Sequence, residues 1–106
     1  MKMATYRVGY MSQMNFNAIS HSMNTLAGAR SFAYEHLGWT YSSLTIVDDT
    51  YGKKYKHIIG EVCMYRIKSG PKKGEIIKLW WDKGKNTYQR VYANGRLGDY
   101  IKNVVW

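Results

Sequence analysis

Cysteine, proline and phenylalanine are scarce in this sequence, and acidic side chains are few. Its 106 residues include one cysteine, one proline, two phenylalanines and seven acidic residues. The single cysteine, Cys63, excludes an internal disulfide and is typical of a reducing compartment. No apolar run approaches the roughly eighteen residues that a membrane-spanning helix needs, and the N-terminal residues Met1–Gly9 do not resemble a secretory signal. We therefore expect a cytoplasmic protein with no membrane partner.

Positive charge is abundant, and all of the net charge lies in the second half of the chain. Residues 1–50 carry three basic and three acidic side chains, whereas residues 51–106 carry thirteen basic and four acidic ones and so hold the whole net charge of +9. Clustered basic residues are typical of a site for a polyanion. A solvated basic face that keeps a small protein soluble is the alternative. Ten tyrosines and four tryptophans add amphipathic rings that suit partly exposed surfaces.

The first half of the chain predicts one helix after two strands. Thr5–Met11 alternates apolar and polar residues, as a strand does, and a turn leads from it into a weaker second strand at Phe16–Met23. Asn24 is the predicted cap of a helix that runs to Leu37, and Gly38 is expected to end it. Four apolar residues at spacings of three and four share one face of this helix: Leu26, Ala29, Ala33 and Leu37.

The second half predicts strands joined by tight turns. Strands are expected at Leu44–Val47, Lys56–Lys68, Glu75–Trp81, Thr87–Tyr92 and Arg96–Ile101. The connections between them have turn chemistry: Asp48–Gly52, Ser69–Gly74, Lys83–Asn86 and Asn94-Gly95. Consecutive hairpins pair antiparallel, and a single helix can cover only one face of such a sheet. We therefore expect a single α+β domain with an antiparallel, hairpin-rich β-sheet and one α-helix packed on one face.

The lysines of the hairpin tips are the first candidates for contact with a nucleic acid or a nucleoprotein. They are Lys53, Lys54, Lys72, Lys73, Lys83 and Lys85. Lysines in turns contact phosphates without reading bases. Because alternate turns of a hairpin sheet lie at the same end, we expect the tips at 53–54 and 83–85 together and the tip at 72–73 at the opposite end. Lysine is also common in exposed turns that bind nothing, and both interpretations stay open.

A stripe of rings and cations on two neighbouring strands is the second candidate. Tyr88, Arg90 and Tyr92 share one face of their strand, and Lys78 and Trp80 share one face of the strand before it. If the register brings the two sets side by side, rings and cations interleave as they do where unstacked bases bind. The same residue types also pair across strands for sheet stability alone.

No residue pattern predicts catalysis, a metal site or a cofactor. His21, His36 and His57 lie on separate predicted elements, without metal-ligand spacing. Cys63 lies among apolar residues, where a buried inert thiol is the ordinary outcome. We therefore expect a non-enzymatic binding protein, with a small metal-independent ribonuclease as the less favoured alternative. Its chemistry would fall to His57, Tyr88, Arg90 and Tyr92.

A protein partner is the other alternative, because aromatic residues and arginine dominate interface hot spots. The candidates for such a contact are Trp80, Trp81, Tyr88, Tyr92 and Trp106. Trp106 ends an apolar segment, which must either dock on the domain or lie in an interface, and docking is the favoured outcome.

Segment Ala29–Val62 combines a helix ending in His36-Leu37-Gly38, a short strand, the turn Asp49-Thr50-Tyr51-Gly52 and a returning strand. In this arrangement, in size and in its basic, Tyr- and Trp-rich composition, the chain resembles small phage and mobile-element proteins of the anti-defence, anti-CRISPR-like kind. The resemblance implies inhibition without catalysis, by occupying a nucleic-acid channel or binding a nucleotide signal. Its implied partner is a bacterial defence complex in the host cytoplasm.

Overall fold

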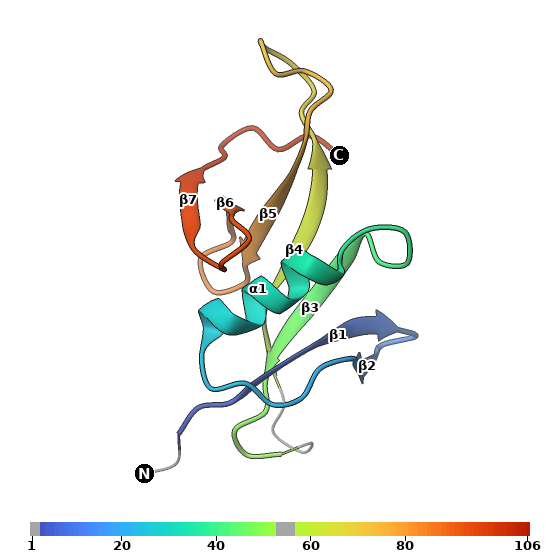
Figure 1. The fold of residues 1–106 in the computed structure, drawn as a ribbon, viewed down its shortest axis with the longest axis vertical. Helices are drawn as coiled ribbons and strands as arrows, with labels where there is room; N and C mark the ends of the chain where they lie inside the picture. Colours follow the sequence, from blue (N-terminus) through green and yellow to red (C-terminus); the bar gives the residue numbers. More distant parts are fainter. Residues whose placement is uncertain (1–2, 53–56) are drawn as a thin grey trace.

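A seven-stranded antiparallel sheet with one helix on one of its faces forms the fold of residues 3–52 and 57–106, the part of the chain that the computed structural model describes (Figure 1). In chain order the elements are β1 (Tyr6–Ser12), β2 (Asn15–Ala18), α1 (Leu26–His36), β3 (Ser43–Asp48), β4 (His57–Arg66), β5 (Ile76–Asp82), β6 (Thr87–Val91) and β7 (Leu97–Tyr100). Their order across the sheet is β2-β1-β3-β4-β5-β6-β7. The α+β class predicted from the sequence is confirmed.

The second strand is shorter than predicted and ends at Ala18. Past this point the Val8 N–H donates to the Ser20 hydroxyl at 2.8 Å. Because a side chain takes the place of a ladder partner, the chain leaves the sheet and meets β1 again at an isolated bridge between Tyr6 and Met23. The other strands begin and end within one or two residues of the predicted positions. The predicted start of β4, Lys56, lies outside the described residues.

Thr25, and not Asn24, caps helix α1. The Thr25 hydroxyl accepts a hydrogen bond from the Gly28 N–H at 3.0 Å, which satisfies one of the free donors of the first turn. The helix ends at His36, one residue before the predicted end, and the Leu37 N–H closes its last turn.

The face of the sheet beneath α1 holds the larger core. Helix residues Ala29 and Ala33 are buried against side chains of β1, β3, β4, β5 and β6. Those side chains are Val8, Leu44, Ile46, Val62, Trp80 and Val91. Trp80 is only 1% exposed, and its indole extends over Gly60, where an added Cβ would lie 2.6 Å from the ring. The Trp81 carbonyl oxygen would lie closer still, so glycine at position 60 is required by the approach of both the neighbouring backbone and this ring.

The C-terminal segment covers part of the opposite face. Here a smaller core of Cys63, Tyr65, Ile77 and Leu79 packs against Ile101 and Val104. The Val105 N–H donates to the Tyr65 hydroxyl at 3.2 Å. The Trp106 ring contacts Tyr65 edge-on, with centroids 5.4 Å apart, and Tyr88 at 5.9 Å. The prediction that the apolar C-terminal end docks on the domain is thus confirmed.

Trp80 and Trp39 differ most in their exposure to solvent, and their substitution tests which part of the fold carries its stability. Trp80→Ala is expected to lower the free energy of unfolding by about 3–5 kcal/mol, because it removes buried apolar surface and leaves a cavity. Trp39→Ala is the matched control, since the Trp39 side chain is fully exposed, and it should change stability by less than about 0.5 kcal/mol. Urea unfolding followed by circular dichroism measures both. Equal losses would contradict the placement of Trp80 in the core.

Candidate functional site

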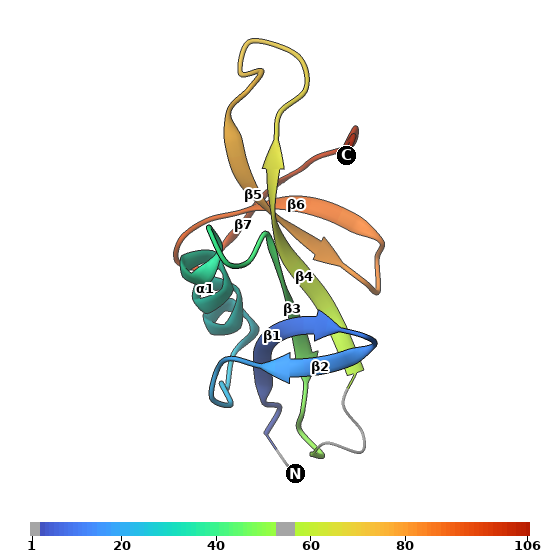
Figure 2. The same cartoon turned by 90° about the vertical axis from the view of Figure 1, so that its right-hand side faces the viewer.

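The face of the sheet away from α1 is hollowed between two hairpins. Figure 2 shows the β1–β2 and β5–β6 hairpins projecting on the side opposite the helix, with β4 passing between them. Two adjoining pockets of about 460 Å³ and 320 Å³ lie here, and Glu61 and Trp81 line both. We name them together the sheet groove. Its other lining residues are Met11, Ser42, Ser43, Thr45, Ile58, Cys63, Met64, Lys83, Tyr88 and Trp106.

A row of four side chains crosses the floor of the sheet groove. The sheet register places Thr45 opposite Glu61, Glu61 opposite Trp81, and Trp81 opposite Tyr88. Residues that oppose one another in an antiparallel sheet point to the same face. Strands β3 to β6 therefore each contribute one side chain to a row that spans three strand spacings, or roughly 14 Å.

The β5–β6 turn is organised so that its lysines face solvent. The Asp82 carboxylate accepts the Lys85 N–H at 3.0 Å, and the Asp82 carbonyl accepts the Asn86 N–H at 2.7 Å. Asn86 has a φ of 53°, a left-handed conformation that asparagine tolerates. Its side-chain carbonyl also accepts the Trp81 indole N–H at 3.1 Å, which holds the indole against the turn. Lys83 and Lys85 are exposed at the tip.

Glu61 is the only acidic side chain among the residues that line the groove. Within the described part of the chain, its carboxylate makes no hydrogen bond and no ion pair. Beside it, burial and then the charge of Glu61 raise the pKa of the Cys63 thiol to about 12. Cys63 therefore stays protonated at neutral pH and is no nucleophile.

The predicted stripe of rings and cations does not form, because the register separates its two halves. Trp80 opposes Gln89, whereas Leu79 opposes Arg90 and Trp81 opposes Tyr88. Lys78 and Trp80 thus face α1, while Tyr88 and Arg90 face the other side. The register on which the stripe depended is therefore not the one observed. It differs by one residue, and a one-residue slip moves every side chain to the opposite face.

Lys78 and Trp80 are engaged inside the domain. The Lys78 ammonium donates to the Tyr34 carbonyl at 2.7 Å and lies 3.9 Å from the centre of the Tyr34 ring. Burial lowers the pKa of Lys78. Trp80 belongs to the core, where the Arg30 guanidinium lies 5.4 Å from its ring centre. Trp80 is therefore not accessible to a partner, whereas Lys78 is partly exposed with its ammonium held by Tyr34.

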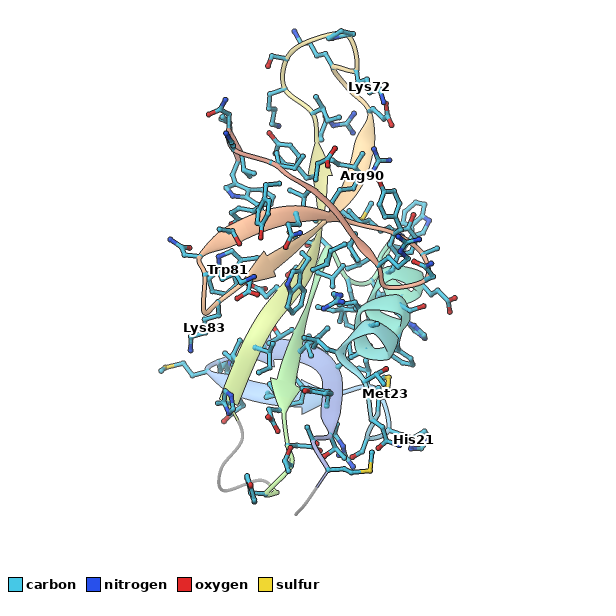
Figure 3. The ribbon with its side chains drawn as sticks, turned by 90° about the vertical axis from the view of Figure 1, so that its left-hand side faces the viewer. His21, Met23, Lys72, Trp81, Lys83 and Arg90 are labelled. Atoms are coloured by element: carbon cyan, nitrogen blue, oxygen red, sulfur yellow. The ribbon has the colours of Figure 1, made fainter. Side chains whose placement is uncertain are left out.

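The remaining predicted residues lie in three places. Tyr88 lines the sheet groove. Tyr92 is exposed, with the Arg90 guanidinium 5.4 Å from its ring centre. Figure 3 shows Lys72 at the tip of the β4–β5 hairpin and Lys83 well apart from it at the β5–β6 turn, so that the two lie beyond opposite ends of β5, as predicted for these two turns.

Two of the predicted lysines, Lys53 and Lys54, lie outside the described residues. Lys73 and Lys85 are exposed beside Lys72 and Lys83 respectively.

The residues of the ribonuclease alternative are not gathered at one place. His57 lies at the first residue of β4, four residues before Glu61. Tyr88 lies two strands away in the row of Glu61. Four residues of strand correspond to an offset of roughly 13 Å, too far for one proton-transfer site.

Comparison with protein families, with curated proteins and with solved structures finds no match for this chain. Among the described residues, no helix is long and apolar enough to cross a bilayer. The same residues hold no group of three or more His, Cys, Asp or Glu side chains placed to bind a metal ion.

Thiol reactivity tests the environment of the groove floor. At pH 8 we expect Cys63 in the folded protein to react with a thiol-specific disulfide reagent about a thousandfold more slowly than in urea, because the raised pKa leaves little thiolate. The reaction is followed by the absorbance of the released thiolate. Equal rates for the folded and unfolded protein would contradict a buried, protonated thiol.

Proposed function

We propose that this protein binds single-stranded nucleic acid in the sheet groove and catalyses no reaction. The observation that carries the proposal is the placement of Trp81, Tyr88 and Trp106 around one groove on the helix-free face of the sheet. Aromatic rings on an open sheet face are a common platform for unpaired bases, and each stacked base contributes about 1–3 kcal/mol.

The form of the groove favours a single strand over a duplex. In a duplex the faces of the bases are covered by their neighbours, so the rings of Trp81 and Tyr88 could stack only on unpaired bases. The two hairpins project on either side of the groove (Figure 2), and the two pockets between them form a hollow in which a flexible strand can lie. Stacking is tolerant of sequence, because every base has a π-face.

Unpaired cations flank this platform on both sides. Lys83 lines the groove at the β5–β6 wall, with Lys85 at the same tip. Lys102 is exposed beyond Tyr88, in an adjoining pocket that Tyr88 also lines. Within the described residues none of these lysines makes an ion pair; the ion pair found there joins Arg7 and Asp49 at 3.2 Å. Their ammonium groups are therefore available to phosphates on either side of the stacked bases.

A protein contact is the second candidate function, and Trp39 is the observation that favours it. This residue lies in the loop between α1 and β3, and its side chain is fully exposed. Tryptophan is among the residues most enriched in interface hot spots. An inhibitor of a nucleoprotein, such as a phage protein directed against a bacterial defence complex, could use the sheet groove for the nucleic acid and Trp39 for the protein.

Substitution of the groove tryptophan tests the stacking platform. Trp81→Ala is expected to weaken binding of a fluorescein-labelled deoxythymidine oligomer by about five- to 150-fold, which corresponds to the loss of one stacked base. Trp39→Ala removes the same side chain outside the groove and should leave the dissociation constant unchanged. Fluorescence anisotropy at fixed low salt measures both. If the two variants bind equally well, the groove is not the platform.

Salt dependence tests the position of the phosphate contacts. The double change Lys83→Ser, Lys85→Ser should reduce the slope of log K against log salt by about 1.4 for a hexanucleotide, since each phosphate contact to a single strand contributes about 0.7. The double change Lys72→Ser, Lys73→Ser alters net charge equally at the far end of the sheet, and a short strand seated in the groove should retain its slope. Identical slopes for both variants would show that only overall charge matters.

A further inference from the structure

Glu61 is the feature of the sheet groove that phosphate binding does not explain. It lies in the floor row between Thr45 and Trp81 and lines both pockets of the groove. A carboxylate at this place repels the phosphates that the surrounding lysines attract. Lys83 lines the same pocket, but the two side chains form no ion pair. Among the residues that the structure describes, this carboxylate thus has no partner, and its partial exposure leaves it open to a ligand.

The chemistry of an ionised carboxylate limits what that ligand can be. It offers two acceptor oxygens and no donor. Desolvating it beneath a bound strand is costly unless donors on that strand replace the lost water. The best partner presents two parallel N–H groups, because bidentate, charge-assisted hydrogen bonds are the strongest of this type.

Among the bases, guanine presents such a pair. Its Watson–Crick edge carries the N1–H and the 2-amino group side by side. Adenine and cytosine each place one amino group beside an acceptor nitrogen, and the N3–H of thymine or uracil lies between two carbonyl oxygens. A carboxylate facing the edge of the base therefore gains two hydrogen bonds from guanine and meets a repulsive acceptor in every other base.

The sheet places a stacking ring and this carboxylate at the required separation. Glu61 and Trp81 oppose each other on neighbouring strands, where the Cβ atoms of a cross-strand pair are about 4.5–5.5 Å apart. A base stacked on the Trp81 indole thus has its edge within reach of the Glu61 oxygens. The hydrogen bond from the indole N–H to Asn86 holds the ring in place while the base is read.

We infer that Glu61 makes the sheet groove selective for guanine in a single strand, with Trp81 stacking on the base and Glu61 accepting its N1–H and 2-amino hydrogens. This inference rests on the proposed single-strand binding. A cationic side chain of a peptide is the other guest that rings and a carboxylate accommodate. The net charge of +9 and the neighbouring Lys83 oppose a cationic guest and favour a nucleic acid.

The test compares deoxythymidine oligomers that carry one central dG, deoxyinosine, dA or dC with the all-thymidine strand. In fluorescence anisotropy at fixed salt, the wild-type protein should bind the dG strand about tenfold more tightly than the all-thymidine strand. This ratio lies within the range expected of one bidentate base contact. Deoxyinosine, which lacks the 2-amino group, should lose part of this preference. The protein with Glu61→Gln should lose the preference for the dG strand over the all-thymidine strand, because the amide offers only one acceptor oxygen and no charge, and its affinity for the all-thymidine strand should equal or exceed that of the wild type.

The matched control is Glu75→Gln, which makes the same change of charge at the exposed end of the β4–β5 connection and should retain the preference for dG. Equal binding of all strands by the wild-type protein would overturn guanine selection and leave single-strand binding standing. No binding of any strand at low salt would overturn the proposed function itself. In that case, binding of an oligoarginine peptide that Glu61→Gln abolishes would assign the groove to a cationic partner. If Glu61→Gln does not fold, the comparison of dG with deoxyinosine on the wild-type protein alone decides the question.

Discussion

The packing of Trp80 beneath α1 is the constraint on which the rest of the molecule depends. Its indole fills the space between the helix and the sheet, and Gly60 leaves the room that the ring needs. Because neighbouring residues of a strand point to opposite faces, burial of Trp80 sends Trp81 to the helix-free face. The largest apolar residue of the core thereby also decides which tryptophan is available to a ligand.

One part of the helix-free face packs against the C-terminal segment, and another part forms the sheet groove. The C-terminal segment covers one part of it, where Tyr65 holds Val105 and the ring of Trp106. This packing does more than stabilise the chain end, because Trp106 also contacts Tyr88 and lines the groove. The part of the face between the β1–β2 and β5–β6 hairpins stays open. Because a single helix can pack on only one face of a sheet, part of the other face stays exposed as a direct consequence of the fold.

The excess of positive charge does not act as one patch. Lys78 is turned inward to Tyr34, and Arg30 lies against the core tryptophan. Lys72 and Lys83 lie far apart, beyond opposite ends of β5 (Figure 3). In the proposed function only the lysines near the rings can cooperate with stacking, so binding depends on where a few cations lie rather than on the net charge. In the same proposal the single carboxylate in the groove supplies a preference among bases, which lysines cannot.

Much of this protein follows from its sequence alone: the helix over Leu26–His36, nearly all of the strands, and the segregation of charge into the second half. These features are local, since side-chain periodicity and turn chemistry act over a few residues. The sequence also contained a signal for the register between β5 and β6. The turn between these strands has four residues and pairs Asp82 with Thr87, and this pairing sets each even-numbered residue of β5 against an odd-numbered residue of β6. The assembly of Thr45, Glu61, Trp81 and Tyr88 into one row was decided only by tertiary structure. Four strands contribute one residue each, and their register is fixed by which face is buried under the helix, a long-range condition that no short stretch of sequence contains.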